Sequence, residues 1–235
     1  MRLVFLLLLL SHWSIAQVNI VQLMGIEIGH LTTFEEHQLT PKTAAAFSAM
    51  QAAAFKDGID IQLVSAYRSF KRQQYIWEDK FERYISEGLS PNQAIARILK
   101  YSTIPGTSRH HWGTDIDVTD GNVKNEKRIL VPSKFHNDGP FAPLQKWMQE
   151  NAQRFGFFLV YTKDAERSGF SYEPWHYSYL PEAEVFLAQY DSRIAFAYFK
   201  SVGVKGSDHI DRDFWDDYYN TFVKGINVKL TLSPL

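Results

Sequence analysis

The sequence predicts an α+β fold on the evidence of two patterns. Serine, threonine or proline begins several segments of helical character, and glycine follows many of them, as expected at the starts and ends of helices. Short apolar or alternating segments between them have the length and period of strands. Because helical and strand-like segments are mixed without a regular β-α-β alternation, an α+β architecture is favoured.

Capping residues indicate where the helices begin. Thr40 with Pro41 and Ser90 with Pro91 each have the pattern of a cap followed by a first helical residue, and Ser69 is a further cap. The expected helices cover residues 41–56, 70–85, 91–100, 144–152, 182–203 and 211–223. The expected strands cover residues 59–65, 114–118, 157–161 and 175–179, and residues 119–142 read as a loop-rich insertion.

Length and composition exclude several classes of protein. The chain has 235 residues, 45% of them hydrophobic, which is enough for one domain with a sizeable core. The formal net charge is −1 and no basic run is present, which argues against nucleic acid or an anionic membrane surface as the main partner. Cysteine is absent, so a metal site has to use histidine and carboxylate ligands.

The segment 1–16 has the features of a signal peptide. Arg2 precedes an unbroken apolar run over residues 3–10, and small side chains at Ser14 and Ala16 match the usual cleavage spacing. The run is shorter than the about 20 apolar residues that a membrane span needs. We therefore expect cleavage after Ala16, no transmembrane segment, and export to the periplasm or the extracellular space.

Four side chains are candidates for a metal site with a catalytic base. Two histidines and one aspartate, His110, His176 and Asp117, make a known catalytic zinc set that leaves one position open. Zinc lowers the pKa of water to about 7 in favourable cases, and Glu173 is the candidate to accept the proton. Residues three apart in a strand face opposite ways, so Glu173 has to lie at a strand start or a bulge to share a site with His176.

Three ordered motifs give the chain a family resemblance. Their residues are Tyr67, Arg68, Ser69 and Gln73 in YRSFKRQ, Ser108, His110, Gly113 and Asp117 in SRHHWGTDID, and Glu173, Trp175 and His176 in EPWH. Over residues 40–180 the chain resembles the VanY-type zinc D-alanyl-D-alanine carboxypeptidases, part of the wider group of lysostaphin, D-Ala-D-Ala peptidase and hedgehog-like folds. The resemblance implies a small antiparallel sheet that holds the zinc site and is flanked by helices.

The resemblance also implies roles for the residues of the first candidate site. His110, Asp117 and His176 would bind zinc (Zn2+), and Glu173 would be the catalytic base. The family's alanine two positions before the zinc aspartate is replaced here by Asp115. By strand alternation Asp115 shares a face with Asp117, so it could hydrogen-bond a histidine ligand, face solvent beyond the strand edge, or narrow the substrate pocket. We favour the first.

The resemblance also implies which residues bind the substrate. Arg68 would hold the terminal carboxylate of the substrate, helped by Ser108 or Gln73. A guanidinium can grip a carboxylate with two parallel charge-assisted hydrogen bonds, which would place the scissile carbonyl over the metal.

The expected organisation is a lead-in over residues 17–39, a zinc peptidase domain over 40–180 and a helical extension over 181–235. Aromatic residues in the extension are expected to pack against the core rather than to form a platform for sugars. The resemblance implies a zinc metallopeptidase that cleaves the D-alanyl-D-alanine bond, or a related D-amino-acid bond, of peptidoglycan stem peptides. We expect it to be a monomer. The alternatives are an endopeptidase of the cross-links, an L,D-type peptidase, and a non-catalytic cell-wall-binding member of the same fold.

Overall fold

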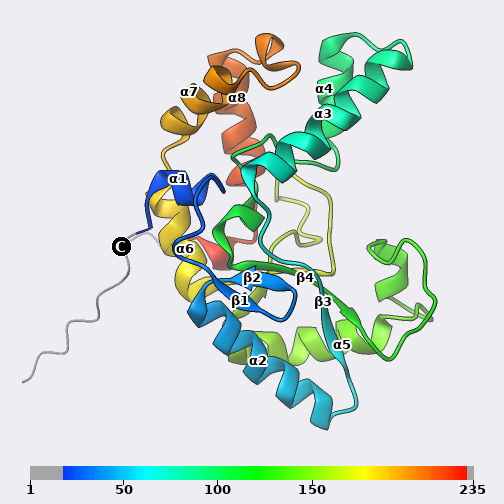
Figure 1. Cartoon of the computed structure of the whole chain (residues 1–235). Helices are drawn as coiled ribbons and strands as arrows, with labels where there is room; N and C mark the ends of the chain where they lie inside the picture. Colours follow the sequence, from blue (N-terminus) through cyan, green and yellow to red (C-terminus); the bar gives the residue numbers. More distant parts are fainter. Residues whose placement is uncertain (1–17, 232–235) are drawn as a thin grey trace, which may run out of the picture.

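The computed structural model describes residues 18–231, and a four-stranded antiparallel sheet lies at its centre (Figure 1). The strand order is β3-β4-β6-β5, with bounds Ile61–Ser65, Asp115–Asp120, His176–Tyr179 and Phe157–Leu159. A separate two-stranded sheet pairs β1 with β2, over Thr32–Phe34 and His37–Leu39. The expected α+β class with a small antiparallel sheet is confirmed.

Helices surround this sheet, and three of them begin at the expected caps. The α-helices are α1 Ile20–Leu23, α2 Pro41–Lys56, α3 Phe70–Ser86, α4 Pro91–Leu99, α5 Ala142–Asn151, α6 Leu180–Gln189, α7 Ser192–Val202 and α8 Arg212–Tyr218. Shorter turns are η1 Arg109–Trp112, η2 Pro132–Phe135, η3 Ala152–Phe155, η4 Ser207–His209, η5 Tyr219–Val223 and η6 Val228–Leu230. The side chains of Thr40, Ser69 and Ser90 each accept a hydrogen bond from the backbone N–H three residues later, which confirms these three caps.

One hydrophobic core lies between the sheet and the helices α2 and α5 (Figure 1). Phe47 of α2 is fully buried there together with Ile116 and Val118 of β4. Burial of side chains of this size stabilises the fold by about 1.5–3 kcal/mol each. Because successive strand residues face opposite ways, Asp115 and Asp117 point to the other face of β4. The core thus anchors the strand that carries the acidic candidates.

A second core joins α3, α4, α6, α7 and α8. Trp77 of α3, Phe199 of α7 and Trp215 of α8 are fully buried in it. Tyr218 at the end of α8 is also buried. The expectation that the C-terminal aromatic residues pack against a core is confirmed for Phe199, Trp215 and Tyr218.

The expected single helix over residues 182–203 is wrong. The chain forms α6 and α7 instead, with a break at Tyr190 and Asp191. The Asp191 carboxylate accepts hydrogen bonds from the backbone N–H groups of Arg193 and Ile194 and so starts a new helix. The helix expected over residues 211–223 is α-helical only to Tyr218 and then continues as the π-helical turn η5.

Some expectations lie outside what the structure tests. The predicted signal peptide falls outside the described residues, and the domain limits stay a prediction. Within residues 18–231, no helix has both the length and the apolar character that crossing a membrane requires.

Candidate active site

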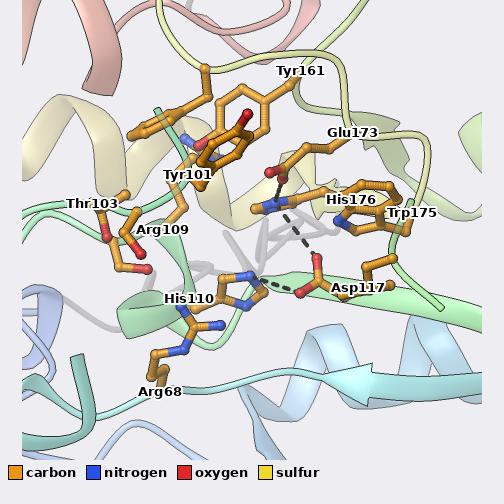
Figure 2. Close-up of a pocket in the computed structure, with 14 residues that line it drawn as sticks. Arg68, Tyr101, Thr103, Arg109, His110, Asp117, Tyr161, Glu173, Trp175 and His176 are labelled. Carbon is orange, nitrogen blue, oxygen red and sulfur yellow. Dashed lines mark hydrogen bonds and ion pairs between the residues drawn. The ribbon is translucent and has the colours of Figure 1, made fainter. Parts of the chain in front are cut away.

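The three candidate metal ligands meet on the face of the sheet opposite the core formed with α2 and α5 (Figure 2). Asp117 of β4 lies directly opposite His176 of β6 in the antiparallel register, and His110 reaches the same point from η1, the turn that precedes β4. One ligand atom from each residue lies within 4.8 Å of the others, and all three residues are buried. The structure therefore brings together the histidines and the aspartate that the sequence singled out.

His110 presents its Nε2 atom to this point. Its Nδ1 lies 2.8 Å from the carbonyl oxygen of Ala66, which can only accept, so Nδ1 carries the hydrogen. Nε2 then has a free lone pair, 3.4 Å from Oδ2 of Asp117. Gly113 makes the turn into β4 with a φ of +71°, and a Cβ there would lie 3.2 Å from the backbone nitrogen of Thr40. Glycine is favoured at this position because other residues rarely adopt this φ and would crowd that backbone.

His176 presents the opposite nitrogen. Its Nε2 lies 2.9 Å from Oδ2 of Asp115, so Nε2 donates its hydrogen to that carboxylate. Its Nδ1 lies 3.6 Å from Oδ1 of Asp117 and 3.1 Å from Oε2 of Glu173. The two imidazoles therefore turn different ring nitrogens toward one point, because each has its other nitrogen occupied.

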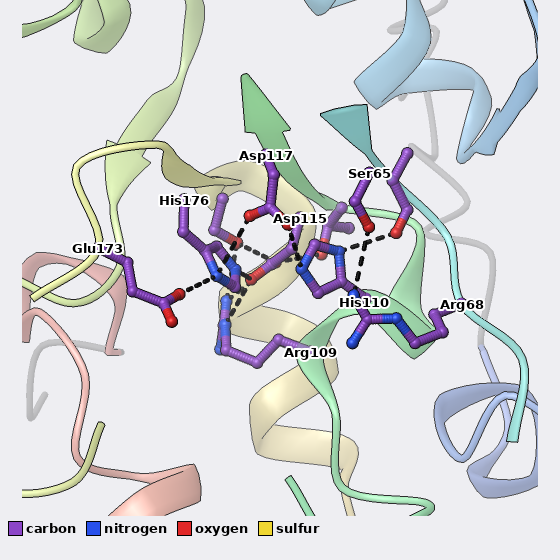
Figure 3. A network of polar contacts seen from close by, with 11 residues as sticks. Ser65, Arg68, Arg109, His110, Asp115, Asp117, Glu173 and His176 are labelled. Carbon is purple, nitrogen blue, oxygen red and sulfur yellow. Dashed lines mark hydrogen bonds and ion pairs between the residues drawn. The ribbon is translucent and has the colours of Figure 1, made fainter. Parts of the chain in front are cut away.

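Asp115 lies beneath the histidine pair in a buried polar network (Figure 3). It accepts hydrogen bonds from Nε of Arg109 at 2.8 Å and from Oγ of Ser178 at 2.5 Å, besides its contact with His176. Burial opposes the charge of this carboxylate, but Arg109 and His176 outweigh it and hold the pKa of Asp115 well below its usual range. Of the three placements open from the sequence, the structure shows the hydrogen bond to a histidine.

Glu173 lies in a turn just before β6. The backbone N–H of His176 donates to the carbonyl of Glu173 at 3.2 Å, and β6 begins at His176. This turn brings two residues three apart to the same side, so the expectation that Glu173 lies at a strand start is confirmed. The Glu173 side chain is 29% exposed whereas His176 is buried. Its carboxylate can therefore contact water at the mouth of the pocket.

Arg68 lines the same pocket as the metal ligands, together with Ser108 (Figure 2). Its Nη1 donates to Oε1 of Gln73 at 3.0 Å and its Nη2 to Oγ of Ser65 at 3.3 Å. Burial lowers the pKa of this guanidinium, an effect that the charges of Asp117 and Glu173 oppose. Within residues 18–231 Arg68 forms no ion pair. An anion entering the pocket would find a partly buried cation without a carboxylate partner in the described part of the chain.

Unlike Ser108, Gln73 lies behind Arg68 and not at the surface of the pocket. It is fully buried, and its amide nitrogen donates to the carbonyl of Thr103 at 2.8 Å while its amide oxygen accepts from Arg68. Both ends of the amide are thus occupied behind the guanidinium. In this structure Gln73 orients Arg68 and does not line the pocket.

Negative charge exceeds positive charge around the two imidazoles, because the carboxylates of Asp115, Asp117 and Glu173 lie near only two guanidiniums, those of Arg109 and Arg68. Burial disfavours a charged His176, but its hydrogen bonds to Asp115 and Glu173 raise its pKa to about 10. Oδ1 of Asp117 is buried without a hydrogen-bond partner in the described part of the chain. A divalent cation would offset the excess negative charge and would give this oxygen a ligand to bind. Two imidazole nitrogens and one carboxylate oxygen are a donor set of catalytic zinc sites, so these residues fit zinc.

Sequence reasoning missed two members of the network under the site. Ser178 could have been found, since it follows His176 by two residues and so shares its strand face. Arg109 could not, because an arginine next to a motif histidine is normally exposed. It is only 2% exposed here, between Asp115 and the ring of Trp112, which lies 4.5 Å from its guanidinium carbon.

The fold and the ligand set together define a class: α+β proteins with a His-Asp-His metal site on one face of a small antiparallel sheet. The chain belongs to the VanY family of D-alanyl-D-alanine carboxypeptidases, whose family model matches residues 36–182. The resemblance stated from the three motifs is thereby confirmed.

Known relatives agree with this assignment. A D-alanyl-D-alanine carboxypeptidase of Enterococcus faecalis is 30% identical over 177 residues, which cover 72% of this chain and 59% of that protein. The bifunctional D-Ala-D-Ala dipeptidase and D-Ala-D-Ala carboxypeptidase VanXYC of Enterococcus gallinarum is 32% identical over 68% of this chain and 78% of its own. The match thus spans less than two thirds of the first of these relatives.

A solved structure has the same fold. It is a mutant of the vancomycin-resistance D,D-pentapeptidase VanY from a VanB-type cassette, in complex with Zn(II). It is 26% identical to this chain, with a TM-score of 0.51, and the match covers 77% of this chain and 89% of the solved one.

Proposed function

We propose that the protein is a zinc-dependent carboxypeptidase that removes the terminal D-alanine from peptidoglycan stem peptides ending in D-Ala-D-Ala. One observation carries the proposal: Arg68 lies in the same pocket as the His110, Asp117 and His176 triad, with Glu173 beside it. A cation for a free carboxylate and a metal site for the adjacent carbonyl are what a carboxypeptidase needs. The zinc complex of the related VanY pentapeptidase supports the choice of metal.

Arg68 fixes the substrate by its terminal carboxylate. Gln73 and Ser65 hold the guanidinium from behind, so its remaining N–H groups can bind the carboxylate as a fork. This contact selects peptides with a free C-terminus and sets the distance from that end to the scissile carbonyl. Zinc held by His110, Asp117 and His176 would polarise the carbonyl and lower the pKa of the attacking water.

Glu173 moves the proton. Its partly exposed carboxylate accepts a proton from the water that attacks the carbonyl carbon of the penultimate D-alanine. The C–N bond then breaks, and Glu173 returns the proton to the amine of the leaving D-alanine. Asp115 and Ala66 keep the two imidazoles in their tautomers throughout.

Product analysis on a pentapeptide stem tests the proposal. The zinc-loaded protein should release one D-alanine from the pentapeptide and leave a tetrapeptide, measured by mass spectrometry. Loss of cross-linked dimers from digested peptidoglycan would instead indicate an endopeptidase, and removal of D-alanine from a tetrapeptide an L,D-carboxypeptidase. Zinc binding without any hydrolysis of these substrates would indicate a binding module.

We also propose that the protein acts outside the cytoplasm, as a monomer. The signal-like segment 1–16 supports export, and a cell-wall substrate requires it. Detection of a mature chain beginning at Gln17 in the culture medium or a periplasmic extract would test export. Light scattering coupled to size exclusion would test the oligomeric state.

A further inference from the structure

Two tyrosines from the C-terminal part of the chain bind the loop over residues 101–108, which is called the pocket loop because four of its residues line the active-site pocket. Tyr218 at the end of α8 and Tyr190 after α6 both lie beyond the family match, which ends at residue 182. The Tyr218 hydroxyl accepts a hydrogen bond from the backbone N–H of Ile104 at 3.1 Å and shares another with Oγ1 of Thr107 at 2.7 Å. The Tyr190 hydroxyl donates to the carbonyl of Gly106 at 2.7 Å. All three contacts are buried.

The same loop reaches Arg68 by a side-chain route. The carbonyl of Thr103, which lines the pocket, accepts a hydrogen bond from the amide nitrogen of Gln73 at 2.8 Å. The amide oxygen of Gln73 accepts from Nη1 of Arg68 at 3.0 Å. A shift of the loop would therefore move the group that orients the guanidinium.

A second route runs through the backbone of Arg68. The N–H of Gly106 donates to Nε2 of His111 at 3.1 Å, so the hydrogen of this imidazole is on Nδ1. Nδ1 donates to the carbonyl of Arg68 at 2.5 Å. His111 is fully buried and makes no contact with the pocket. It joins the loop to the chain segment that carries the arginine.

Packing alone does not explain the two hydroxyl groups. The rings of Tyr190 and Tyr218 belong to the second core, where phenylalanine would bury a similar apolar area. A buried hydroxyl is unfavourable unless it is hydrogen-bonded. Here both hydroxyls bind groups of one loop, including the N–H of Ile104 and the carbonyl of Gly106. Without the hydroxyls these two backbone groups would lose the hydrogen bonds that satisfy them in the protein interior.

We infer that the C-terminal helices, through Tyr218 and Tyr190, position Arg68 and thereby set the affinity of the site for the substrate carboxylate. The inference rests on the proposed function, because the carboxylate is that of the D-alanyl peptide. Both routes reach Arg68, whereas the imidazole of His176 is held by Asp115 on the sheet and that of His110 by the carbonyl of Ala66. Loosening the loop therefore weakens substrate capture and leaves the metal bound.

The experiment compares Tyr218→Phe with Tyr219→Phe in the full zinc-loaded chain. Tyr219 is the matched control, since it is the next residue and its hydroxyl makes no hydrogen bond within residues 18–231. For a peptide ending in D-Ala-D-Ala, Tyr218→Phe should raise KM about tenfold. Its kcat should change by less than about twofold, and its zinc stoichiometry should stay at the wild-type value. Tyr219→Phe should keep both constants at wild-type values.

A double mutant tests whether the effect passes through the guanidinium. Combined with Arg68→Lys, Tyr218→Phe should raise KM by much less than it does alone, because the oriented fork is already lost. Three results would overturn the inference: an unchanged KM in Tyr218→Phe, a loss confined to kcat or to zinc content, or full additivity of Tyr218→Phe with Arg68→Lys. In each case the proposed function would still stand if the wild-type protein cleaves the peptide. A wild-type protein that cleaves no such peptide would overturn both.

Discussion

Oδ2 of Asp115 lies 2.9 Å from Nε2 of His176, and this contact decides which ring nitrogen faces the metal site. The carboxylate is held in turn by Arg109 and Ser178, so it cannot turn away (Figure 3). A histidine ligand oriented by a carboxylate has a fixed tautomer and a more basic free nitrogen. The residue that departs from the family pattern is therefore bound directly to a candidate ligand.

We expect Asp115→Asn to weaken zinc binding. The amide oxygen can still accept from His176, but the charge that makes the imidazole a better ligand is lost, and Arg109 loses its ion pair. The zinc dissociation constant should rise about 10- to 100-fold, measured by competition with a chromophoric chelator. Ser178→Ala, which removes one neutral donor to the same carboxylate and an acceptor for Nη2 of Arg109 but leaves the charge of Asp115, is the control. An unchanged dissociation constant in Asp115→Asn would refute this role.

Glu173→Gln should retain zinc and lose hydrolysis. Glutamine keeps the size of the side chain but cannot accept the water proton, so kcat should fall about 10²- to 10⁴-fold. Metal content is measured on the same sample by atomic emission. Glu166, an acid with no ion pair in the described part of the chain, offers a control in Glu166→Gln. Hydrolysis at a near wild-type rate in Glu173→Gln would mean that another group is the base.

Arg68→Lys should affect substrate binding selectively. Lysine keeps the charge but cannot form two parallel hydrogen bonds, and the contacts with Gln73 and Ser65 are lost. The KM for a D-Ala-D-Ala peptide should rise about tenfold or more. The same peptide with a C-terminal amide should be a poor substrate for both proteins, with little difference between them. A large difference on the amide would contradict carboxylate recognition by Arg68.

Removal of zinc should abolish activity and lower the melting temperature. A ligand that binds only the native state stabilises it by about 2.7 kcal/mol at a concentration 100 times its dissociation constant. Dialysis against a chelator, followed by calorimetry with and without added zinc, measures the shift. His176→Ala lacks a ligand, so zinc should raise its melting temperature much less. Equal zinc-dependent shifts in both proteins would place the metal elsewhere.

Local patterns in the sequence were sufficient for three of the helix starts and for the candidate donor set. Thr40, Ser69 and Ser90 cap helices through bonds to residues three positions away, so their neighbours in the sequence contain the whole cause. Glycine at 113 and the turn before His176 are equally local. The break at Asp191 was missed, because the helical pattern continues on both sides of it.

Only the tertiary structure decided which groups surround the metal site. The contact of Asp115 with His176 depends on the register of β4 against β6, and that of Tyr218 with Ile104 on how α8 packs against the pocket loop. These partners are 61 and 114 residues apart. Chemical type and spacing within a motif are local properties of a sequence. The pairing of strands and the burial of Arg109 arise only when distant segments share one core.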